Sequence, residues 1–179
     1  MVVFVGTMRS CMPKFALPAI VHSTSRCLIL GTLPGDQSLA AQFYYLHPRN
    51  QFWRIMQAVF ADEPGLTSVT RAAFLARHQL ALWDVLHAAE RVGSLDTAIT
   101  NPIPNDFQTF FTANPAIQKV GLNGMKAQQL FMRLVWPNLT SELQSRLELV
   151  GLPSTSPANT QAFAKKVEAW MWLRNALGA

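Results

Sequence analysis

Short apolar runs alternate with segments of helical periodicity along most of this chain. Each apolar run ends at turn residues, as is typical of a strand that is buried on both faces of a parallel sheet. These runs lie at residues 26–32, 79–84, 117–122 and 146–152. Apolar side chains at helical spacing predict helices at residues 50–60, 67–78, 105–113, 125–136 and 160–174. The alternation predicts an α/β fold, a three-layer sandwich in which helices flank a central, mainly parallel four-stranded sheet.

One segment interrupts this alternation, at residues 88–106 (AAERVGSLDTAITNPIPND). We expect a loop there, with Asn105 near its end placed to cap the helix that follows. The sequence has no internal repeat and no low-complexity linker. We therefore expect a loose tail at residues 1–25 and a single domain at residues 26–179.

Polar features follow each of the predicted strands. They are GTLPG at residues 31–35, Asp84, Asn123, and LPSTSPAN at residues 152–159. The carboxyl ends of parallel strands share one edge of a sheet, and ligands bind outside that edge. We therefore expect four loops that are distant in sequence to converge on one pocket. Polar loops at this edge also occur in unrelated proteins, so the motifs must decide the chemistry.

Composition narrows the class of protein. With 179 residues, of which 50% are hydrophobic and 14% charged, the chain can bury the core of one compact domain. It has no long uncharged apolar run, so we expect no membrane span. Cys11 and Cys27 do not have metal-ligand spacing, which favours reduced thiols in an intracellular, cytoplasmic protein. The net charge of +5 and the pI near 9.7 favour an anionic partner.

Four separated motifs together resemble one known family. They are, in order, LILGTLPGDQSL, FYYLHPRNQFW, LWDVL with GSLD, and LPSTSPAN. Over residues 26–176 they resemble the uracil-DNA glycosylase superfamily, and most closely its hypoxanthine-DNA (deoxyinosine) glycosylase branch. The resemblance implies a monofunctional repair glycosylase that flips a deaminated base out of DNA, hydrolyses its N-glycosidic bond and leaves an abasic site. It also implies DNA as the partner and no metal or organic cofactor, and we expect a monomer.

The resemblance further implies how the flipped base is held. Tyr45 falls where a related branch stacks an aromatic ring on the base, with Tyr44 and Phe43 as walls of the pocket. The alternative is that the two tyrosines are core aromatics. Asp84 lies near the position of the base-reading amide of uracil-specific relatives, so it either contacts the base or is a surface or capping aspartate.

Hydrolysis requires a water molecule held at C1′ of the sugar, on the face opposite the leaving base. In uracil-specific relatives the residue that holds it precedes the proline of the first motif, where this chain has Leu33. Leu33 can line the base site but cannot make a hydrogen bond, which argues against ordinary uracil chemistry. In the hypoxanthine branch the role passes to the asparagine of the HPxN segment, here Asn50, whose alternative role is to cap the next helix. His47 is a secondary site residue that either assists the reaction or fixes the loop.

The LPSTSPAN motif resembles the superfamily loop that enters the minor groove of DNA. Ser154, Thr155 and Ser156 can donate hydrogen bonds to a phosphate or to the base, and a plain turn is the alternative. Leu152 replaces the polar first residue of other branches, so its side chain cannot help the leaving base. Basic residues that could add phosphate contacts are Arg49, Lys126, Lys165 and Lys166. Neither signature motif contains a lysine, so we expect no Schiff-base lyase step.

Three functions remain open at this point. The first is a hypoxanthine-DNA glycosylase. The second is a glycosylase of the same superfamily that acts on uracil, xanthine or mismatches. The third is a non-catalytic nucleic-acid-binding domain, which would bind DNA without turnover and would bind equally well after Asn50→Ala.

Overall fold

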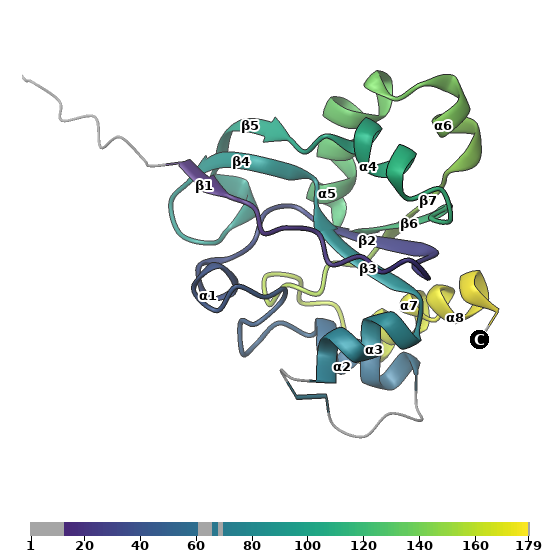
Figure 1. Cartoon of the computed structure of the whole chain (residues 1–179). Helices are drawn as coiled ribbons and strands as arrows, with labels where there is room; N and C mark the ends of the chain where they lie inside the picture. The colour runs from purple at the N-terminus through teal and green to yellow at the C-terminus, as the bar shows by residue number, and fades with distance from the viewer. Residues whose placement is uncertain (1–12, 61–65, 68–69, 179) are drawn as a thin grey trace, which may run out of the picture.

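A parallel sheet forms the centre of the molecule. The computed structural model describes residues 13–60, 66–67 and 70–178. Within them the central sheet has the order β3-β2-β6-β7, and all of its pairings are parallel. Its strands are β2 (Cys27–Gly31), β3 (Leu80–Asp84), β6 (Lys119–Asn123) and β7 (Glu148–Leu152) (Figure 1). The four strands predicted from apolar runs, and their parallel arrangement, are confirmed.

Helices cover both faces of this sheet. On one side lie α2 (Phe52–Val59), α3 (Thr70–Arg77), α7 (Phe163–Trp170) and α8 (Trp172–Leu177) (Figure 1). On the other side lie α4 (Phe107–Ala113), α5 (Met125–Leu130) and α6 (Ser141–Arg146). Successive side chains of β2 enter opposite layers, Leu28 and Leu30 the α4 side and Cys27 and Ile29 the α2 side. Every position of this strand is therefore apolar, and the predicted three-layer α/β fold is confirmed.

Residues 88–106 contain a β-hairpin, so the predicted loop was wrong. β4 (Leu86–Arg91) and β5 (Ile99–Pro104) pair antiparallel, and β1 (Pro13–Phe15) adds to β4. Within the described residues these strands form a second sheet of order β1-β4-β5. The prolines of β5 hid the strand from the sequence pattern, but an edge strand tolerates proline because one side of it makes no ladder hydrogen bonds. A 3-10 turn, η1 (Asp96–Ala98), follows the hairpin tip.

The last part of the expected tail, residues 13–25, packs against the domain, so the prediction of a loose tail is wrong for these residues. Besides β1, Ile20 forms an antiparallel bridge with Leu82 of β3, and the side chain of Leu17 is buried. These contacts are long-range, which is why the local sequence did not indicate them. The expectations for residues 1–12, including the thiol of Cys11, lie outside the described residues, and Cys27 is a buried free thiol in β2.

Several helices differ in detail from the sequence-based prediction. The helix expected at residues 125–136 is α-helical only to Leu130 and continues as a π-helical turn, η2 (Phe131–Val135), and a 3-10 turn, η3 (Trp136–Asn138). Pro137 explains the end, because proline lacks the N–H that an α-helix needs. Asn105 does not cap α4: Asp106 does, accepting a hydrogen bond from the N–H of Thr109 at 3.0 Å. The short α6 was not predicted.

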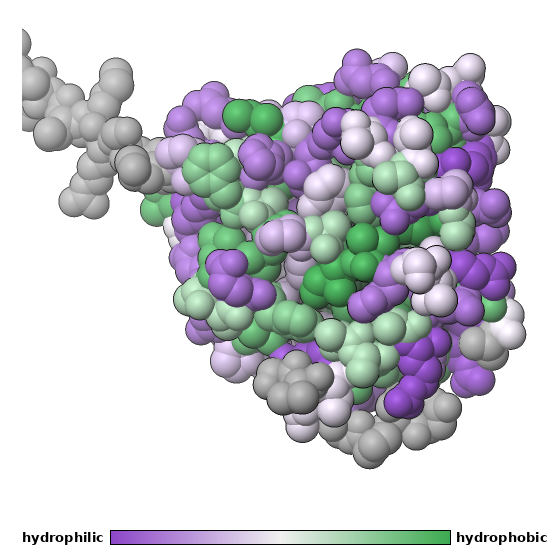
Figure 2. Space-filling model, viewed as in Figure 1, coloured by the Kyte–Doolittle hydropathy of each residue, from purple (hydrophilic) through white to green (hydrophobic). Residues whose placement is uncertain are grey.

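The outer surface is polar around an apolar middle. In the space-filling view, hydrophobic side chains gather in the middle of the face, over the central sheet, and hydrophilic ones occupy its margins (Figure 2). No helix in the described ranges is both long enough and apolar enough to cross a membrane.

Candidate active site

The carboxyl ends of the central strands lie side by side. Gly31 of β2 pairs with Asp84 of β3, and Asn123 of β6 pairs with Leu152 of β7. Each of these residues is the last of its strand, so the loops that follow all begin at one edge of the sheet. This edge is where parallel α/β sheets bind their ligands.

Asp84 places a carboxyl group at the end of β3, an outer strand of the central sheet. Its side chain is 3% exposed, and Oδ2 has no hydrogen-bond partner among the described residues. The pKa of Asp84 is raised to about 8, mainly by burial and also by the nearby charge of Asp96, while Arg91 acts in the opposite direction. The carboxyl is therefore mainly protonated at neutral pH. Asn105 fixes the backbone here, since its Nδ2 donates to the carbonyl oxygen of Asp84 at 2.8 Å.

The hydroxyl of Tyr45 faces the same spot. A Cβ added to Gly31 would lie 2.4 Å from Oδ1 of Asp84 and 3.0 Å from the hydroxyl of Tyr45. Glycine is thus the residue that lets both polar groups approach the end of β2. The hydroxyl is buried without a hydrogen-bond partner among the described residues. Burial raises the pKa of Tyr45, and Asn123 is near enough to lower it slightly, although the two groups do not have hydrogen-bond geometry.

The backbone of Tyr45 is held in an unfavourable conformation. Its φ is +59°, a left-handed value that a bulky side chain rarely adopts and that costs about 1–3 kcal/mol. The ring is stacked on Phe52 with the centroids 4.1 Å apart. Such strain is found most often at functional sites, where the surrounding packing maintains it.

The two aromatic residues before Tyr45, Tyr44 and Phe43, have partners of their own. Tyr44 is buried in the core, and its hydroxyl donates to the carbonyl oxygens of Leu17 and Pro18 at 3.0 and 3.1 Å. Phe43 is half-buried and stacked on Trp53. The rings of Tyr44 and Tyr45 are in contact, with their centroids 6.2 Å apart. Their hydroxyls separate, because that of Tyr45 lies near Gly31 at the end of β2 and that of Tyr44 binds the backbone of Leu17 and Pro18.

The HPRN segment forms a turn immediately before α2. Oδ1 of Asn50 accepts a hydrogen bond from the N–H of Phe52, the first residue of α2, at 2.9 Å. The N-cap residue itself, Gln51, makes no side-chain capping bond. The N–H of Asn50 donates to the carbonyl oxygen of His47 at 2.8 Å, and Nδ1 of His47 accepts from the N–H of Arg49 at 3.1 Å. These contacts fix the turn, while the side chain of Asn50 stays half-buried.

The LPSTSPAN loop is tied to the end of β6. Asn123 accepts a hydrogen bond from the N–H of Thr155 and donates one to its hydroxyl, both at 3.0 Å. Thr155 is fully buried by this pairing, so its hydroxyl does not reach the surface where DNA would lie. Ser154 and Ser156 are half-buried, and each hydroxyl accepts from a backbone N–H two positions further on.

Lys166 joins this loop to the HPRN segment. It is fully buried, and its Nζ donates to Oε1 of Gln51 at 2.9 Å and to the carbonyl oxygen of Asn159 at 2.8 Å. The backbone N–H of Gln51 in turn donates to the carbonyl oxygen of Thr155. Burial lowers the pKa of Lys166. We expected this lysine to contact a phosphate. It lies three positions after Phe163, however, and this spacing puts it on the apolar face of α7. Lys165 is exposed.

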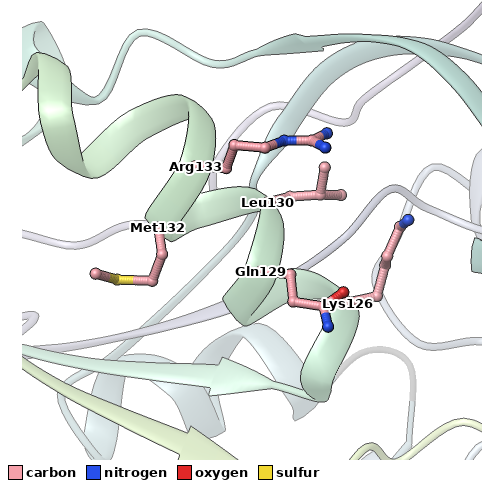
Figure 3. A pocket seen from close by; sticks show the side chains of 5 residues that line it. All are labelled: Lys126, Gln129, Leu130, Met132 and Arg133. Carbon is pink, nitrogen blue, oxygen red and sulfur yellow. The ribbon is translucent and has the colours of Figure 1, made fainter.

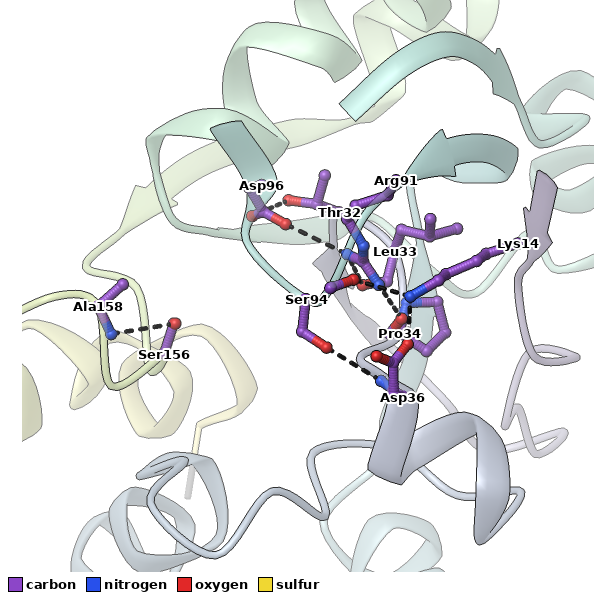
Figure 4. A network of polar contacts seen from close by, with 11 residues as sticks. Lys14, Thr32, Leu33, Pro34, Asp36, Arg91, Ser94, Asp96, Ser156 and Ala158 are labelled. Atoms are coloured by element: carbon purple, nitrogen blue, oxygen red, sulfur yellow. Dashed lines mark hydrogen bonds and ion pairs between the residues drawn. The ribbon is translucent and has the colours of Figure 1, made fainter. Parts of the chain in front are cut away.

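The β4–β5 hairpin holds the first motif in place. Arg91, which is almost fully buried, donates to the carbonyl oxygens of Leu33 and Pro34. Its guanidinium lies 3.6 Å from a carboxylate oxygen of Asp96, and the other oxygen accepts from the hydroxyl of Thr32 at 2.9 Å. Figure 4 shows these side chains converging between the hairpin and the loop after β2. The side chain of Leu33 is buried in the core on the α4 side, and its backbone carbonyl is what the hairpin binds.

No metal site is evident among the described residues: no group of three or more His, Cys, Asp or Glu side chains could hold an ion there. Sequence reasoning missed Gly31, Arg91 and the structural role of Lys166. Gly31 could have been found from its position at the end of an apolar run, where a strand meets the expected ligand site. Arg91 was missed because its segment was expected to be a loop.

The chain is similar to known proteins over most of its length. The family model of the uracil DNA glycosylase superfamily matches residues 18–174. Two relatives named hypoxanthine DNA glycosylase, from Methanosarcina barkeri and Methanosarcina acetivorans, are each 30% identical to it, with 89% of this chain and 96% of the relative covered. A solution NMR structure from Methanosarcina acetivorans, reported as a candidate uracil DNA glycosylase, is similar with a TM-score of 0.75 at 29% identity. That match covers 94% of this chain and 100% of the other.

Proposed function

The chain belongs to the uracil DNA glycosylase superfamily, and we propose that it excises hypoxanthine from DNA. It is a DNA glycosylase, a hydrolase that cuts the N-glycosidic bond of a deaminated base. The names of its two Methanosarcina relatives favour hypoxanthine as that base. Leu33 favours it as well, because uracil-specific relatives carry a hydrogen-bonding residue at that position.

One observation carries the base-binding proposal: two buried polar atoms, on side chains that both lie close to Gly31, lack partners among the described residues. They are Oδ2 of Asp84 and the hydroxyl of Tyr45. A buried polar atom without a partner costs about 1–3 kcal/mol, so a ligand that pairs with it gains affinity. The flipped base offers N–H and C=O groups on its edge. A protonated carboxyl can donate to such a carbonyl and accept from the adjacent N–H, which suits the edge of hypoxanthine.

The protonated state of Asp84 also suits the reaction. The base leaves with the electron pair of the bond to C1′, so negative charge develops on it. A carboxylate beside it would oppose that charge, whereas a neutral acid can donate a hydrogen bond to it. The raised pKa of Asp84 keeps the acid neutral at physiological pH.

We assign the attacking water to Asn50. Its amide lies on the turn before α2, and the transition state, which resembles an oxocarbenium ion, requires a positioned water more than a strong base. The oxygen of that water bonds to C1′, the base departs with a proton, and an abasic site remains. The ring of Tyr45 would stack against the flipped base, with Phe43 nearby, while His47 fixes the turn. Ser154 and Ser156 would contact the DNA backbone.

The same edge of N–H and C=O is present in uracil and xanthine, so the second candidate function is excision of these bases. We propose that the enzyme acts as a monomer in the cytoplasm, where the thiol of Cys27 stays reduced. Sedimentation with and without DNA would test the oligomeric state.

Single-turnover excision tests the proposal on duplexes carrying deoxyinosine, deoxyuridine, deoxyxanthosine or deoxyadenosine. We expect fastest release from deoxyinosine and none of adenine. A faster release of uracil would transfer the proposal to the second candidate. Duplex binding without release of any base would favour the non-catalytic module instead.

A further inference from the structure

We propose that the tip of the β4–β5 hairpin, Val92 and Leu95, inserts into the base stack of duplex DNA where the flipped nucleotide leaves a gap. This inference rests on the proposed function, because only a base-flipping enzyme creates such a gap. The two side chains are 76% and 60% exposed, and both lie on the short loop between β4 and β5.

The tip is held firmly although its side chains face outward. Arg91 binds the carbonyl oxygens of the first motif from one end of the tip, and Asp96 accepts from Thr32 at the other end. Between them the hydroxyl of Ser94 accepts a hydrogen bond from the N–H of Asp36 at 3.2 Å. A rigid support of this kind is what an apolar side chain needs to separate stacked bases, because a flexible loop would bend away first.

The tip lies beside the proposed base site. Asp96 is near enough to Asp84 and Tyr45 to raise the pKa of both. The part of the first motif to which the tip is bound, Thr32 to Pro34, directly follows Gly31. An inserted side chain here would therefore enter the duplex next to the position from which the base is withdrawn.

A groove with two cationic side chains lies on α5 and η2, near the tip. It has a volume of about 490 Å³ and is lined by Lys126, Gln129, Leu130, Met132 and Arg133. In Figure 3 Lys126 and Arg133 project to the same side of the helix and Met132 to the other. Lys126 is near enough to lower the pKa of Asp96, so the groove adjoins the tip. Two cations in a groove match the phosphates of a DNA strand that runs past the inserted side chains.

The loop expected to enter the minor groove offers no large apolar side chain. Leu152 is buried, and the exposed apolar residues that follow are the smaller Pro157 and Ala158. Figure 4 shows Ser156 and Ala158 on a loop well separated from the hairpin. Met125, which is 73% exposed after the end of β6, is the competing side chain at this edge.

The test measures insertion directly, without requiring base release. A duplex with a tetrahydrofuran abasic analogue carries 2-aminopurine opposite it, and its fluorescence reports unstacking. We expect the wild type to change this fluorescence and Val92→Ser/Leu95→Ser to lose at least half of the change at saturating protein. Ile103→Ser, an equally apolar exposed position on β5 of the same hairpin, is the matched control and should keep it.

Measuring excision as well distinguishes a failure of this inference from a failure of the proposed function. Release of hypoxanthine from duplex DNA should fall about tenfold or more in the double variant, while release from single-stranded DNA should hardly change, because no stack has to be filled. An unchanged 2-aminopurine signal in the double variant, or its loss in Met125→Ser alone, would overturn the insertion. A wild type that changes the signal but releases no hypoxanthine would leave the insertion standing and refute the proposed function.

Discussion

Lys166 donates a hydrogen bond to the side chain of Gln51 at 2.9 Å, although the two residues are 115 positions apart in the sequence. The same ammonium group binds the backbone of Asn159, so it joins the turn that carries Asn50 to the LPSTSPAN loop. This buried lysine therefore links two loops by hydrogen bonds to their neutral oxygens.

Replacing Lys166 with methionine should therefore loosen both loops. We expect a loss of about 2 kcal/mol in the free energy of unfolding, because two buried oxygens lose their donor. We also expect at least tenfold slower excision, measured by urea denaturation and single-turnover kinetics. Lys165→Met, at the adjacent exposed position, should change neither. Equal effects of the two substitutions would contradict this role.

Asn50 can be tested for capping and catalysis separately. Asn50→Ser keeps an oxygen that can cap α2, whereas Asn50→Ala removes it and should cost about 1 kcal/mol of stability. Both should slow excision about a hundredfold, because neither positions water as the amide does. DNA binding by fluorescence anisotropy should persist. Full activity of Asn50→Ser would show that Asn50 only caps the helix.

Asp84 should make stability fall as the pH rises. The pKa of its carboxyl is about 8 in the folded protein against 3.8 ordinarily, so the folded state holds the proton more tightly. The stabilisation is complete below about pH 4 and is lost as the pH rises to about 8, by at most about 1.4 kcal/mol per pH unit. Urea denaturation of wild type and Asp84→Asn at pH 5 and 8.5 measures the difference, which should favour the variant at the higher pH.

The excision rate should depend on pH through the same carboxyl group of Asp84. Wild-type excision should decline above about pH 8 as Asp84 loses its proton, and Asp84→Asn should be slower but flat across that range. Asp106→Asn, at an exposed helix cap whose pKa is lowered, should retain the wild-type decline. A decline that persists in Asp84→Asn would assign the titration to another group.

Gly31→Ala should close the space between Asp84 and Tyr45. The added Cβ would lie 2.4 Å from a carboxyl oxygen, so the carboxyl must move. We expect about 1–3 kcal/mol of destabilisation and a loss of excision of at least tenfold. Gly35→Ala meets only the side chain of Ser94 at 3.3 Å and has an ordinary φ of −72°, so it should be tolerated. Thermal unfolding and excision assays compare the two.

The central sheet was predictable because its strands are buried on both faces. Every position of β2 must be apolar, and such a run is visible in sequence without knowledge of its partners. The placement of Asp84 and of the start of the LPSTSPAN loop at the carboxyl ends of their strands followed from the parallel arrangement alone. The hairpin escaped because β5 contains Pro102 and Pro104, and an edge position was not foreseeable from local pattern.

The roles of individual loop residues were less predictable. Tyr44 and Tyr45 are neighbours in sequence, yet Tyr45 has a left-handed φ and a hydroxyl near Gly31, whereas the hydroxyl of Tyr44 binds the backbone of Leu17 and Pro18. Thr155 and Ser154 look alike in sequence, but the amide of Asn123 selects Thr155 for burial. Both outcomes depend on partners that are distant along the chain, which no local pattern contains.

The hydrogen bond from Lys166 of α7 to Gln51, next to the HPRN turn, has a consequence for folding during protein synthesis. Gly31, Tyr45 and Asn50 leave the ribosome early, but Gln51 must wait for Lys166 and Asn123 must wait for Thr155. A nascent chain therefore cannot form the bond between Gln51 and Lys166 until α7 has emerged. We expect the turn that carries Asn50 to become fixed only at this late stage of synthesis.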